Sequence, residues 1–333
     1  MEQFSFVSAT TEAQAGAAAA RSSTAQIGAT VRYVAGGTNL VDLLKLDVER
    51  PKQVVDINAL EMSGIQPSNG GLRIGALARN SDVANDATVK RDYAVLSEAI
   101  LSGASPQIRN MASTAGNLLQ RTRCPYFRDL AHKCNKREPG SGCDAIDGYN
   151  RGLAILGTSE HCIATNPSDQ NVALTALEAT VEIRGVKGER KVPIAEFYKL
   201  PGNTPHIETV LEPGDLITAV TLPAPMAGAK SGYLKLRDRA AYEFALASAA
   251  VVLGVSGGKV THARVALGGV ATIPWRSREA EAVLMGKPAT RETFVRAAEA
   301  ALKDAKPRSE NGFKVELAKR CIVHALTTVS AAR

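Results

Sequence analysis

Four of the five cysteines lie close together in the middle of the chain. They are Cys124, Cys134, Cys143 and Cys162, and the gaps between them hold 9, 8 and 18 residues. The surrounding segment, residues 113–169, is rich in Gly, Arg, Lys, Asn and Asp and has little apolar periodicity before Gly152. A loop of this length without structure of its own is uncommon in a compact domain and is usually functional or disordered. Four thiols that bind one inorganic centre would give this loop a reason to be ordered.

Thiols at this spacing are compatible with several kinds of chemistry. Disulfides are commonest in small secreted domains, whereas this chain has 333 residues and an odd number of cysteines. A structural zinc site favours closely spaced cysteine pairs of the C-x-x-C type, and the segment contains none. Iron–sulfur clusters are held by cysteine thiolates at more varied spacings. Spacing alone therefore leaves a cluster and a set of unpaired loop thiols as the main interpretations, with disulfides and zinc less favoured.

A second candidate site lies near the N-terminus, where a strand runs through a glycine turn into a helix. Residues 31–35 (VRYVA) have the character of a strand, Gly36 and Gly37 form the turn, and residues 40–46 (LVDLLKL) have helical spacing. Glycines let the backbone approach a ligand closely, and exposed N–H groups at the start of a helix favour an anion. The stretch could cradle a phosphate, although a glycine pair in this position is more often only a turn.

The rest of the chain offers no hydrolytic site. Its five histidines, among them His132 and His161, form no nucleophile–base pattern, and no H-E-x-x-H motif occurs. The net charge of +7 could indicate nucleic-acid binding. However, the few aromatic residues are not interleaved with basic ones, and no helix-turn-helix or zinc-finger signature is present. We expect the basic charge to serve anionic cofactors or acidic partner subunits, and we expect no nucleic-acid partner.

Basic residues are concentrated in the first half of the cysteine segment. They are Arg121, Arg123, Arg128, Lys133, Lys136 and Arg137. A cluster with four thiolate ligands is anionic, so nearby cations would stabilise it and affect its potential. A solvated charged loop or a surface that faces a partner accounts for the same residues equally well.

Regular elements on either side of the cysteine segment predict an α+β protein. The pattern breaks at residues 223–225 (PAP), which we take as the boundary between two parts. In the second part, three strands are expected, joined as antiparallel neighbours and followed by helices. The expected strands cover residues 231–237, 246–255 and 263–269, and the expected helices cover residues 277–285, 291–303 and 312–329.

Three strings around the cysteines resemble those of a known family. RTRCPYF, KCNKREPGSGC and LGTSEHCIATNPSD are similar to a [4Fe-4S]-binding insertion in one branch of the molybdenum hydroxylase flavoproteins, the FAD-binding subunits of the xanthine dehydrogenase and aldehyde oxidoreductase family. The resemblance is strongest to the FAD subunits of bacterial periplasmic aldehyde oxidoreductases. It implies that Cys124, Cys134, Cys143 and Cys162 are the cluster ligands. Cys321 stands in a helix-like run and is expected to be a buried core thiol.

The same resemblance extends to the expected FAD site. AGGTNL resembles the pyrophosphate-binding loop, and STAGN at residues 113–117 resembles a second loop that usually carries paired glycines, the first of which is Ala115 here. Asp169 would otherwise be only a helix cap, and Lys235 only a surface cation on a strand. The FAD-binding residues that the resemblance implies are Ala35, Gly36, Gly37, Thr38, Asn39, Leu40, Ser113, Thr114, Gly116, Asn117, Ser168, Asp169 and Lys235.

The resemblance covers essentially the whole chain and implies its architecture and function. A two-part FAD-binding domain of the PCMH type would span residues 1–224, with the [4Fe-4S] insertion at about 119–163, and a C-terminal flavoprotein domain would span residues 228–333. The implied function is electron transfer in a heterotrimeric, molybdenum-dependent aldehyde oxidoreductase. Electrons would pass from a molybdenum-cofactor large subunit and a [2Fe-2S] small subunit through FAD to an external acceptor. No residue of this chain would be catalytic itself, because the chemistry belongs to the cofactors.

Three other functions remain open from the sequence. One is the β subunit of an enzyme resembling 4-hydroxybenzoyl-CoA reductase, which carries a related insertion. The second is a non-redox, zinc-stabilised binding module. The third is a stand-alone FAD oxidase, for which no substrate pocket or catalytic base can be named.

The N-terminal residues bear on where the protein works. No basic residue precedes Arg21, so we expect no export signal in the chain itself. No apolar run approaches the ~18 residues of a membrane span, so no membrane insertion is expected. The resemblance implies a periplasmic location through export with a signal-bearing partner subunit, and the cytoplasm is the alternative.

Overall fold

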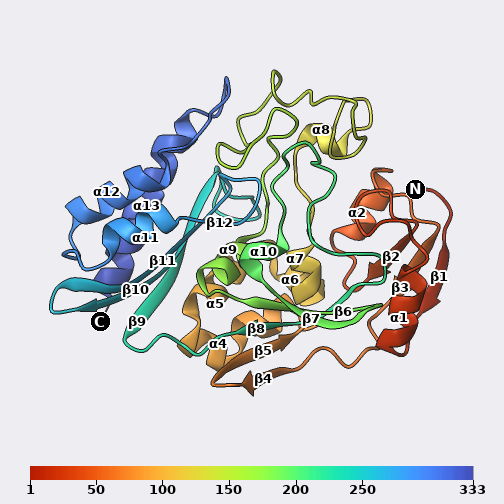
Figure 1. Ribbon diagram of the computed structural model, residues 1–333, viewed down its shortest axis with the longest axis horizontal. Coiled ribbons are helices and arrows are strands. Elements are labelled where there is room, and N and C mark those ends of the chain that lie inside the picture. Colours follow the sequence, from red (N-terminus) through yellow and green to blue (C-terminus); the bar gives the residue numbers. More distant parts are fainter. Residues whose placement is uncertain (333) are drawn as a thin grey trace.

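The computed structural model describes residues 1–332, which form a mixed α/β protein with three sheets (Figure 1). The first sheet is small and parallel, with the strand order β1-β3-β2. Its elements are β1 (Ser5–Ser8), α1 (Glu12–Ala19), β2 (Val31–Val34), α2 (Leu40–Lys45) and β3 (Gln53–Asp56). Strand β2 runs through Gly36 and Gly37 into α2, so the predicted order of strand, glycine turn and helix is confirmed.

A five-stranded antiparallel sheet forms the middle of the molecule, with the order β4-β5-β8-β6-β7. Its strands are β4 (Ile65–Ser68), β5 (Gly71–Gly75), β6 (Thr180–Gly185), β7 (Gly188–Pro193) and β8 (Leu216–Leu222). The helices beside it are α3 (Asn80–Asn85), α4 (Ala87–Asp92), α5 (Ala94–Ser102), α6 (Pro106–Met111), α7 (Thr114–Leu118), α9 (Asp169–Ala176) and α10 (Ile194–Phe197). Strand β8 pairs with both β5 and β6, so the chain leaves this sheet before the cysteines and returns to complete it afterwards.

The last third of the chain forms a four-stranded antiparallel sheet with the order β12-β11-β10-β9 (Figure 1). Its elements are β9 (Ala229–Leu236), β10 (Ala247–Ser256), β11 (Lys259–Gly268), β12 (Trp275–Arg276), α11 (Arg278–Leu284), α12 (Arg291–Ala301) and α13 (Phe313–Ala331). The predicted fold class is confirmed, and the three predicted strands are present. The prediction missed β12, because two residues are too few for a periodic pattern. Within residues 1–332, no helix combines the length and apolar character that a membrane span requires.

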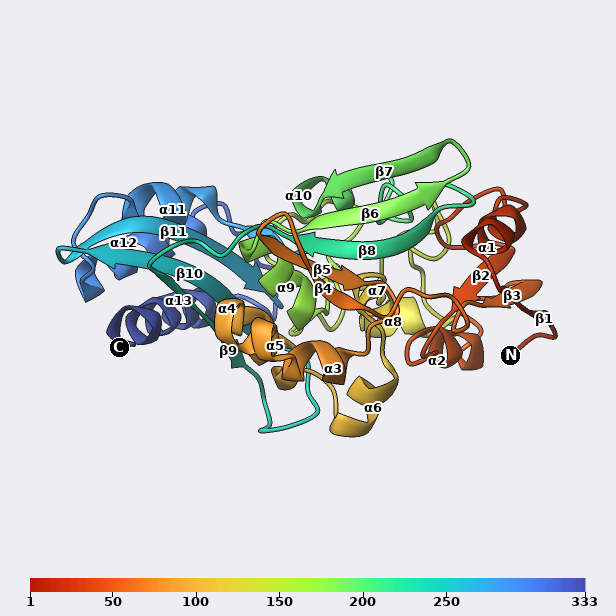
Figure 2. The same cartoon turned by 90° about the horizontal axis from the view of Figure 1, so that it is seen from below.

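Strand β10 is buried on both faces. Val251 and Leu253 pack into the core that includes residues of α11–α13, whereas Ala250 and Val252 pack into the core of the five-stranded sheet and its helices. Successive side chains of a strand point to opposite faces, so a strand in this position needs a continuous apolar run. The C-terminal sheet is therefore a middle layer, with α5 and α9 on one side and α13 on the other (Figure 2).

The cysteine loop, residues 119–163, stands out from the rest of the chain at the top of Figure 1. Its helix is the single turn α8 (Pro125–Arg128), and it packs with Leu43 and Val48 into a small core around Phe127 and Ile163. The returning part of the loop is fastened to the C-terminal sheet. The N–H of Ile155 donates to the carbonyl of Val270 at 2.8 Å, and Leu156 forms a β-bridge with Ala271. The loop is thus held at its far end by the last third of the chain.

Two valines on β10 test the burial of this strand. Val251 is fully buried, and Val255 near the end of the strand is 38% exposed. Val251→Ala removes two methyl groups from a packed core and should lower the free energy of unfolding by about 2 kcal/mol. Val255→Ala removes the same atoms with the same change in strand propensity and should cost about 1 kcal/mol or less. Urea unfolding followed by circular dichroism measures both values, and equal losses would contradict the two-sided burial.

Candidate functional site

Two cavities meet where the small parallel sheet faces α6, α7 and the C-terminal sheet. The larger has a volume of about 520 Å³ and the smaller about 210 Å³, and both are lined by Thr38, Asn39 and Gly116. Functional pockets typically measure about 300–1,000 Å³, so the larger cavity alone is of ligand size. Most of the predicted FAD-binding residues line one cavity or both: Ala35, Gly36, Gly37, Thr38, Asn39, Leu40, Ser113, Gly116, Asn117, Asp169 and Lys235. Stretches that are far apart in the sequence therefore converge here.

The glycine turn between β2 and α2 lies directly against the residues before α7. A Cβ atom added to Gly36 would lie 1.8 Å from the carbonyl oxygen of Met111. Gly37 has a φ of +71°, a conformation that favours glycine. The turn thus needs both glycines, one for close approach and one for backbone conformation. It brings the first predicted FAD loop into contact with the second.

The second loop has a different role for each of its residues. The hydroxyl of Ser113 accepts a hydrogen bond from the N–H of Gly116 at 3.2 Å and so caps α7. The buried hydroxyl of Thr114 donates to the carbonyl of Ala78, which faces it away from the cavities. The half-buried methyl group of Ala115, which stands where the family usually has glycine, packs against the main core and also lines the smaller cavity.

Ser168 lies behind the cavity wall. Its hydroxyl caps α9 by accepting from the N–H of Asn171 at 3.0 Å and donates to Oδ1 of Asn117 at 2.7 Å. Thr114 and Ser168 therefore support the cavity from behind, whereas the other predicted FAD-binding residues line it.

A buried ion pair forms part of the wall of the larger cavity. Nζ of Lys235 lies 2.8 Å from Oδ2 of Asp169, and the two side chains are only 3% and 9% exposed. The hydroxyl of Tyr233 donates to the other carboxylate oxygen at 2.5 Å. Burial, together with the charge of Asp169, raises the pKa of Tyr233 well above its usual value. Tyr233 therefore remains a donor, and Lys235 is a buried cation and not a surface one.

Further cations surround the larger cavity. Arg109, Arg123, Arg128 and Arg239 line it together with Lys235, against the carboxylates of Asp42, Asp169 and Glu243. Nδ2 of Asn39 and Nη2 of Arg121 are buried at the smaller cavity, and within residues 1–332 neither has a hydrogen-bond partner. A ligand with several anionic or carbonyl oxygens would suit these groups, because it would supply acceptors to unpaired donors.

The four predicted ligand cysteines share the small core of the cysteine loop. Cys124, Cys134 and Cys162 are buried, and Cys143, which forms a β-bridge with Cys134, is half-buried at its edge. All are free thiols, so the disulfide interpretation is wrong. Cys321 lies apart in the core of the C-terminal sheet, as expected. Burial raises the pKa of Cys124 to about 12 and that of Cys143 to about 11, so a bound metal would have to displace their protons.

The spacing of the thiols bears on which centre they could hold. Among residues 1–332, no three His, Cys, Asp or Glu side chains are grouped closely enough to hold a single metal ion. The thiols still influence one another electrostatically, because Cys134 and Cys162 both contribute to raising the pKa of Cys124 and of Cys143, after the larger effect of burial. The structure thus places the four thiols in one small core without grouping them, among the described residues, as ligands of a single ion.

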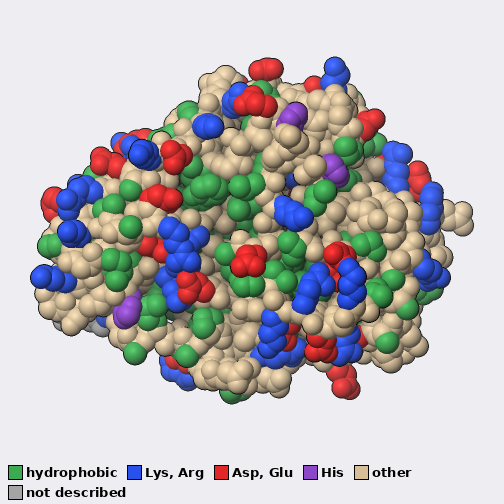
Figure 3. Space-filling model, in the orientation of Figure 1, with side chains coloured by type: hydrophobic (Ala, Val, Ile, Leu, Met, Phe, Trp, Pro, Cys, Tyr) green, Lys and Arg blue, Asp and Glu red, His purple; other side chains and the backbone are tan. Residues whose placement is uncertain are grey.

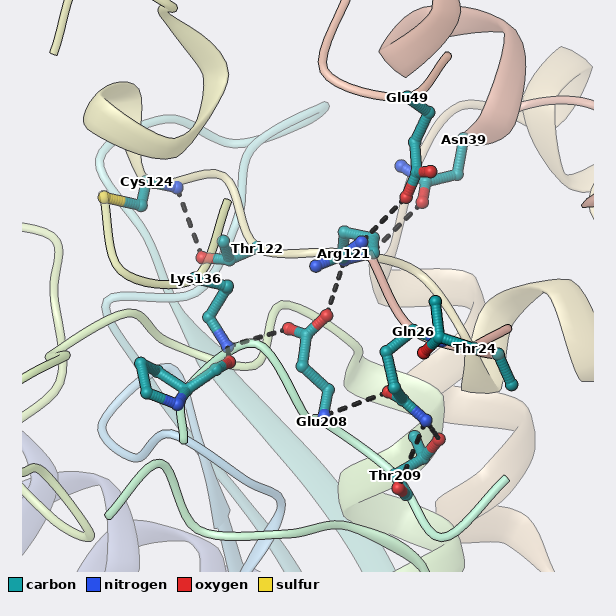
Figure 4. A network of polar contacts seen from close by, with 12 residues as sticks. Thr24, Gln26, Asn39, Glu49, Arg121, Thr122, Cys124, Lys136, Glu208 and Thr209 are labelled. Carbon is teal, nitrogen blue, oxygen red and sulfur yellow. Dashed lines mark hydrogen bonds and ion pairs between the residues drawn. The ribbon is translucent and has the colours of Figure 1, made fainter. Parts of the chain in front are cut away.

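A buried network of charges, which the sequence did not reveal, connects the cysteine loop to the first glycine loop (Figure 4). The guanidinium of Arg121 lies 2.7 Å from a carboxylate oxygen of Glu49 and 2.5 Å from one of Glu208. The backbone N–H of Arg121 donates to Oδ1 of Asn39 at 3.0 Å. Nζ of Lys136 lies 2.9 Å from the second carboxylate oxygen of Glu208. Burial alone would raise the pKa of Glu208, but Arg121 and Lys136 outweigh it and lower that pKa.

The basic residues of the cysteine loop therefore divide into buried and exposed groups. Arg121 and Lys136 are in the network, Arg128 pairs with Asp42 at 2.7 Å, and Lys133 is exposed. Over the face seen in Figure 3, acidic and basic side chains are interspersed. The acidic partners Glu49 and Glu208 are far away in the sequence, and the excess of cations in the loop was the only available sign of them.

Comparisons with known proteins agree with this arrangement. Residues 2–225 match the FAD binding domain in molybdopterin dehydrogenase, and residues 232–329 match the CO dehydrogenase flavoprotein C-terminal domain. The aldehyde oxidoreductase FAD-binding subunit PaoB of Escherichia coli strain K12 is 52% identical over 303 residues, which cover 90% of this chain and 92% of that protein. The carbon monoxide dehydrogenase medium chain of Hydrogenophaga pseudoflava is 27% identical over 312 residues, covering 92% and 91%.

A solved structure gives the same result for the fold. A chain of the carbon monoxide dehydrogenase from Hydrogenophaga pseudoflava matches with a TM-score of 0.77 at 26% identity, covering 99% of this chain and 98% of that one.

The close contact at Gly36 leads to a test of the site. Gly36→Ala places a methyl group against backbone atoms that cannot move aside, so the two loops must separate. We expect the purified variant to retain less than about a tenth of the wild-type flavin, which corresponds to a loss of about 1.4 kcal/mol or more in binding. Gly64→Ala is the control, because nothing lies within 4 Å of the added Cβ. Flavin released by acid and measured by fluorescence gives the result, and full retention in Gly36→Ala would contradict the placement.

Proposed function

Because this chain belongs to the FAD-binding subunits of the molybdenum hydroxylase family of oxidoreductases, we propose that it is the electron-transfer flavoprotein of a molybdenum-dependent aldehyde oxidoreductase. The observation that carries the proposal is the pair of adjoining cavities, on which two glycine-containing loops and the Asp169–Lys235 pair converge. Aldehyde is the favoured substrate class of the whole enzyme, because PaoB, a 52% identical relative, is an aldehyde oxidoreductase subunit.

The residues present fit FAD. The turn at Gly36 and Gly37 would take the pyrophosphate, and the unpaired donors of Asn39 and Arg121 would meet its oxygens. The ammonium group of Lys235, held in position by Asp169, would place a positive charge at the flavin end of the larger cavity. When bound, FAD would supply the electron chemistry, and the chain would supply its orientation and electrostatics.

We further propose that Cys124, Cys134, Cys143 and Cys162 hold a [4Fe-4S] cluster. The support is that the four thiols are free, lie in one small core and are flanked by buried cations. A zinc-stabilised module is less favoured, because the side chains that could hold a single ion are not grouped for it within residues 1–332. A four-iron cluster with four thiolate ligands is the alternative that uses every cysteine of the loop.

Partner subunits complete the proposal. Relatives carry names such as "FAD-binding subunit" and "medium chain", which describe parts of larger enzymes. We propose that this chain joins a molybdenum-cofactor large subunit and a [2Fe-2S] small subunit and passes their electrons through FAD to an external acceptor. A reductive complex resembling 4-hydroxybenzoyl-CoA reductase would differ in its molybdenum subunit and not in this chain. Export to the periplasm with a signal-bearing partner is proposed for the location.

The cofactor content of the anaerobically purified protein tests the proposal. We expect flavin absorption, a broad brown shoulder, and about four irons and four sulfides per chain. Iron and zinc analysis by mass spectrometry measures the metals, and extraction identifies the flavin. A colourless protein with one zinc would refute the redox function, whereas flavin without iron would leave the FAD assignment and remove the cluster.

Single cysteine substitutions test the ligand assignment. Cys134→Ser and Cys143→Ser should each lose most of the bound iron and lower the thermal midpoint, because a bound metal centre contributes directly to folding. Cys321→Ser is the matched control, since its thiol lies in the C-terminal core and donates to the carbonyl of Leu234. Iron analysis of each variant decides the matter. Loss of iron in Cys321→Ser, with retention in Cys134→Ser, would show the assignment to be wrong.

A further inference from the structure

The charge bridge, which we define as Arg121, Glu208 and Lys136, lies between the two proposed cofactor sites (Figure 4). At one end, Arg121 contacts Asn39 of the first glycine loop through its backbone N–H. At the other end, Lys136 stands two residues after Cys134, and Nδ2 of the intervening Asn135 donates to the carbonyl of His161 at 3.1 Å, next to Cys162. The three charged side chains thus form a continuous path from one site to the other.

The charges of the bridge and its neighbours do not cancel. Three cations, Arg32, Arg121 and Lys136, face two carboxylates, Glu49 and Glu208, so one positive charge remains. The side chains of Arg121 and Lys136 are each only 10% exposed. Burying charged side chains costs free energy, so a buried excess of positive charge calls for a compensating anion nearby. An anionic centre beside the bridge would compensate the excess positive charge.

The last proposed cluster ligand borders the same space as the bridge. Cys162, Arg121, Lys136 and Glu208 all line one small cavity of about 100 Å³. Coulomb interactions between groups that border one buried cavity are several times stronger than in bulk water, because the protein interior has a lower effective dielectric constant. The charge of Lys136 or Glu208 therefore changes the electrostatic potential at any centre that Cys134 and Cys162 hold.

We propose that Lys136 and Glu208 set the reduction potential of the centre bound by the cysteine loop, with Lys136 raising it and Glu208 lowering it. The inference rests on the proposed [4Fe-4S] cluster. One-electron reduction adds a negative charge to the cluster, so a buried cation stabilises the reduced form and a buried carboxylate destabilises it. Neither residue lines the two cavities of the proposed FAD site, and Arg121, which lines one of them, keeps its charge when either residue is replaced, so the flavin potential should change far less. Neither residue is a ligand of the proposed cluster, so both act on it only through their charges.

Potentiometric titration followed by electron paramagnetic resonance tests this in the full chain. Lys136→Gln should shift the one-electron equilibrium at least tenfold toward the oxidised cluster, a change of about 59 mV to lower potential. Glu208→Gln should shift it in the opposite direction. Lys133→Gln is the matched control, because Lys133 is an exposed cation that directly precedes Cys134. We expect its potential to stay near the wild-type value, and the flavin potential to serve as an internal reference in every sample.

The outcomes separate this inference from the proposed function. A wild-type chain without iron would remove the cluster and with it the basis of the inference. A four-iron wild type whose potential is unchanged in both buried variants, or shifts in the same direction in both, would overturn the inference alone. If Lys136→Gln loses its iron, two other variants test the inference. Lys136→Arg keeps the charge and should leave the potential unchanged, and Glu208→Gln should raise it. Loss of iron in all of these, and also in the charge-neutral pair Lys136→Met/Glu208→Met, would assign the bridge a structural role only.

Discussion

The buried ion pair of Asp169 and Lys235 connects the two parts of the chain. Asp169 begins α9 beside the central sheet, and Lys235 stands on β9 of the C-terminal sheet. A buried pair adds little net stability, but an unpaired charge left in the interior would cost several kcal/mol. We infer that the pair acts through specificity, because only one placement of β9 against α9 brings both charges together. The same placement closes one wall of the larger cavity.

The alternation along β9 explains how one strand serves two layers. Tyr233 and Lys235 face α5 and α9, where they contact Asp169, while Leu234 and Leu236 pack against the core of α11–α13. In β10, the next strand, the segment Ala249–Leu253 is apolar on both faces, whereas Arg264 of β11 adds an ion pair with Glu178 at 2.6 Å. The C-terminal sheet thus forms the interface through β9 and is fixed in place through β10.

Much of the fold followed from local pattern, and much of the site did not. The strand–glycine–helix order near Gly36 and the burial of Cys321 could be predicted, because each depends on neighbouring residues or on an apolar run. The resemblance identified the residues of the cavities but could not separate the lining ones from Thr114 and Ser168, whose hydroxyl groups are engaged behind the wall. That distinction depends on a rotamer and a distant partner, and neither leaves a mark in the sequence.

The charge bridge was out of reach for the same reason. Glu49 and Glu208 are ordinary acidic residues in sequence, and only the folded chain places both beside Arg121. The basic residues of the loop suggested an anionic neighbour, and the structure identifies carboxylates as the first of them. Buried polar groups of this kind are where sequence patterns carry the least information, because each is determined by its partner and not by its neighbours.

The fastening of the cysteine loop to Val270 and Ala271 has a consequence for how the protein is made. All four cysteines of the loop leave the ribosome well before these two residues, which hold Ile155 and Leu156 in place. The loop can therefore reach its final form only after most of the C-terminal sheet has been synthesised. Until then Ile155 and Leu156 lack the partners that hold the returning part of the loop. Assembly of a metal centre here would accordingly be a late event in the life of the nascent chain.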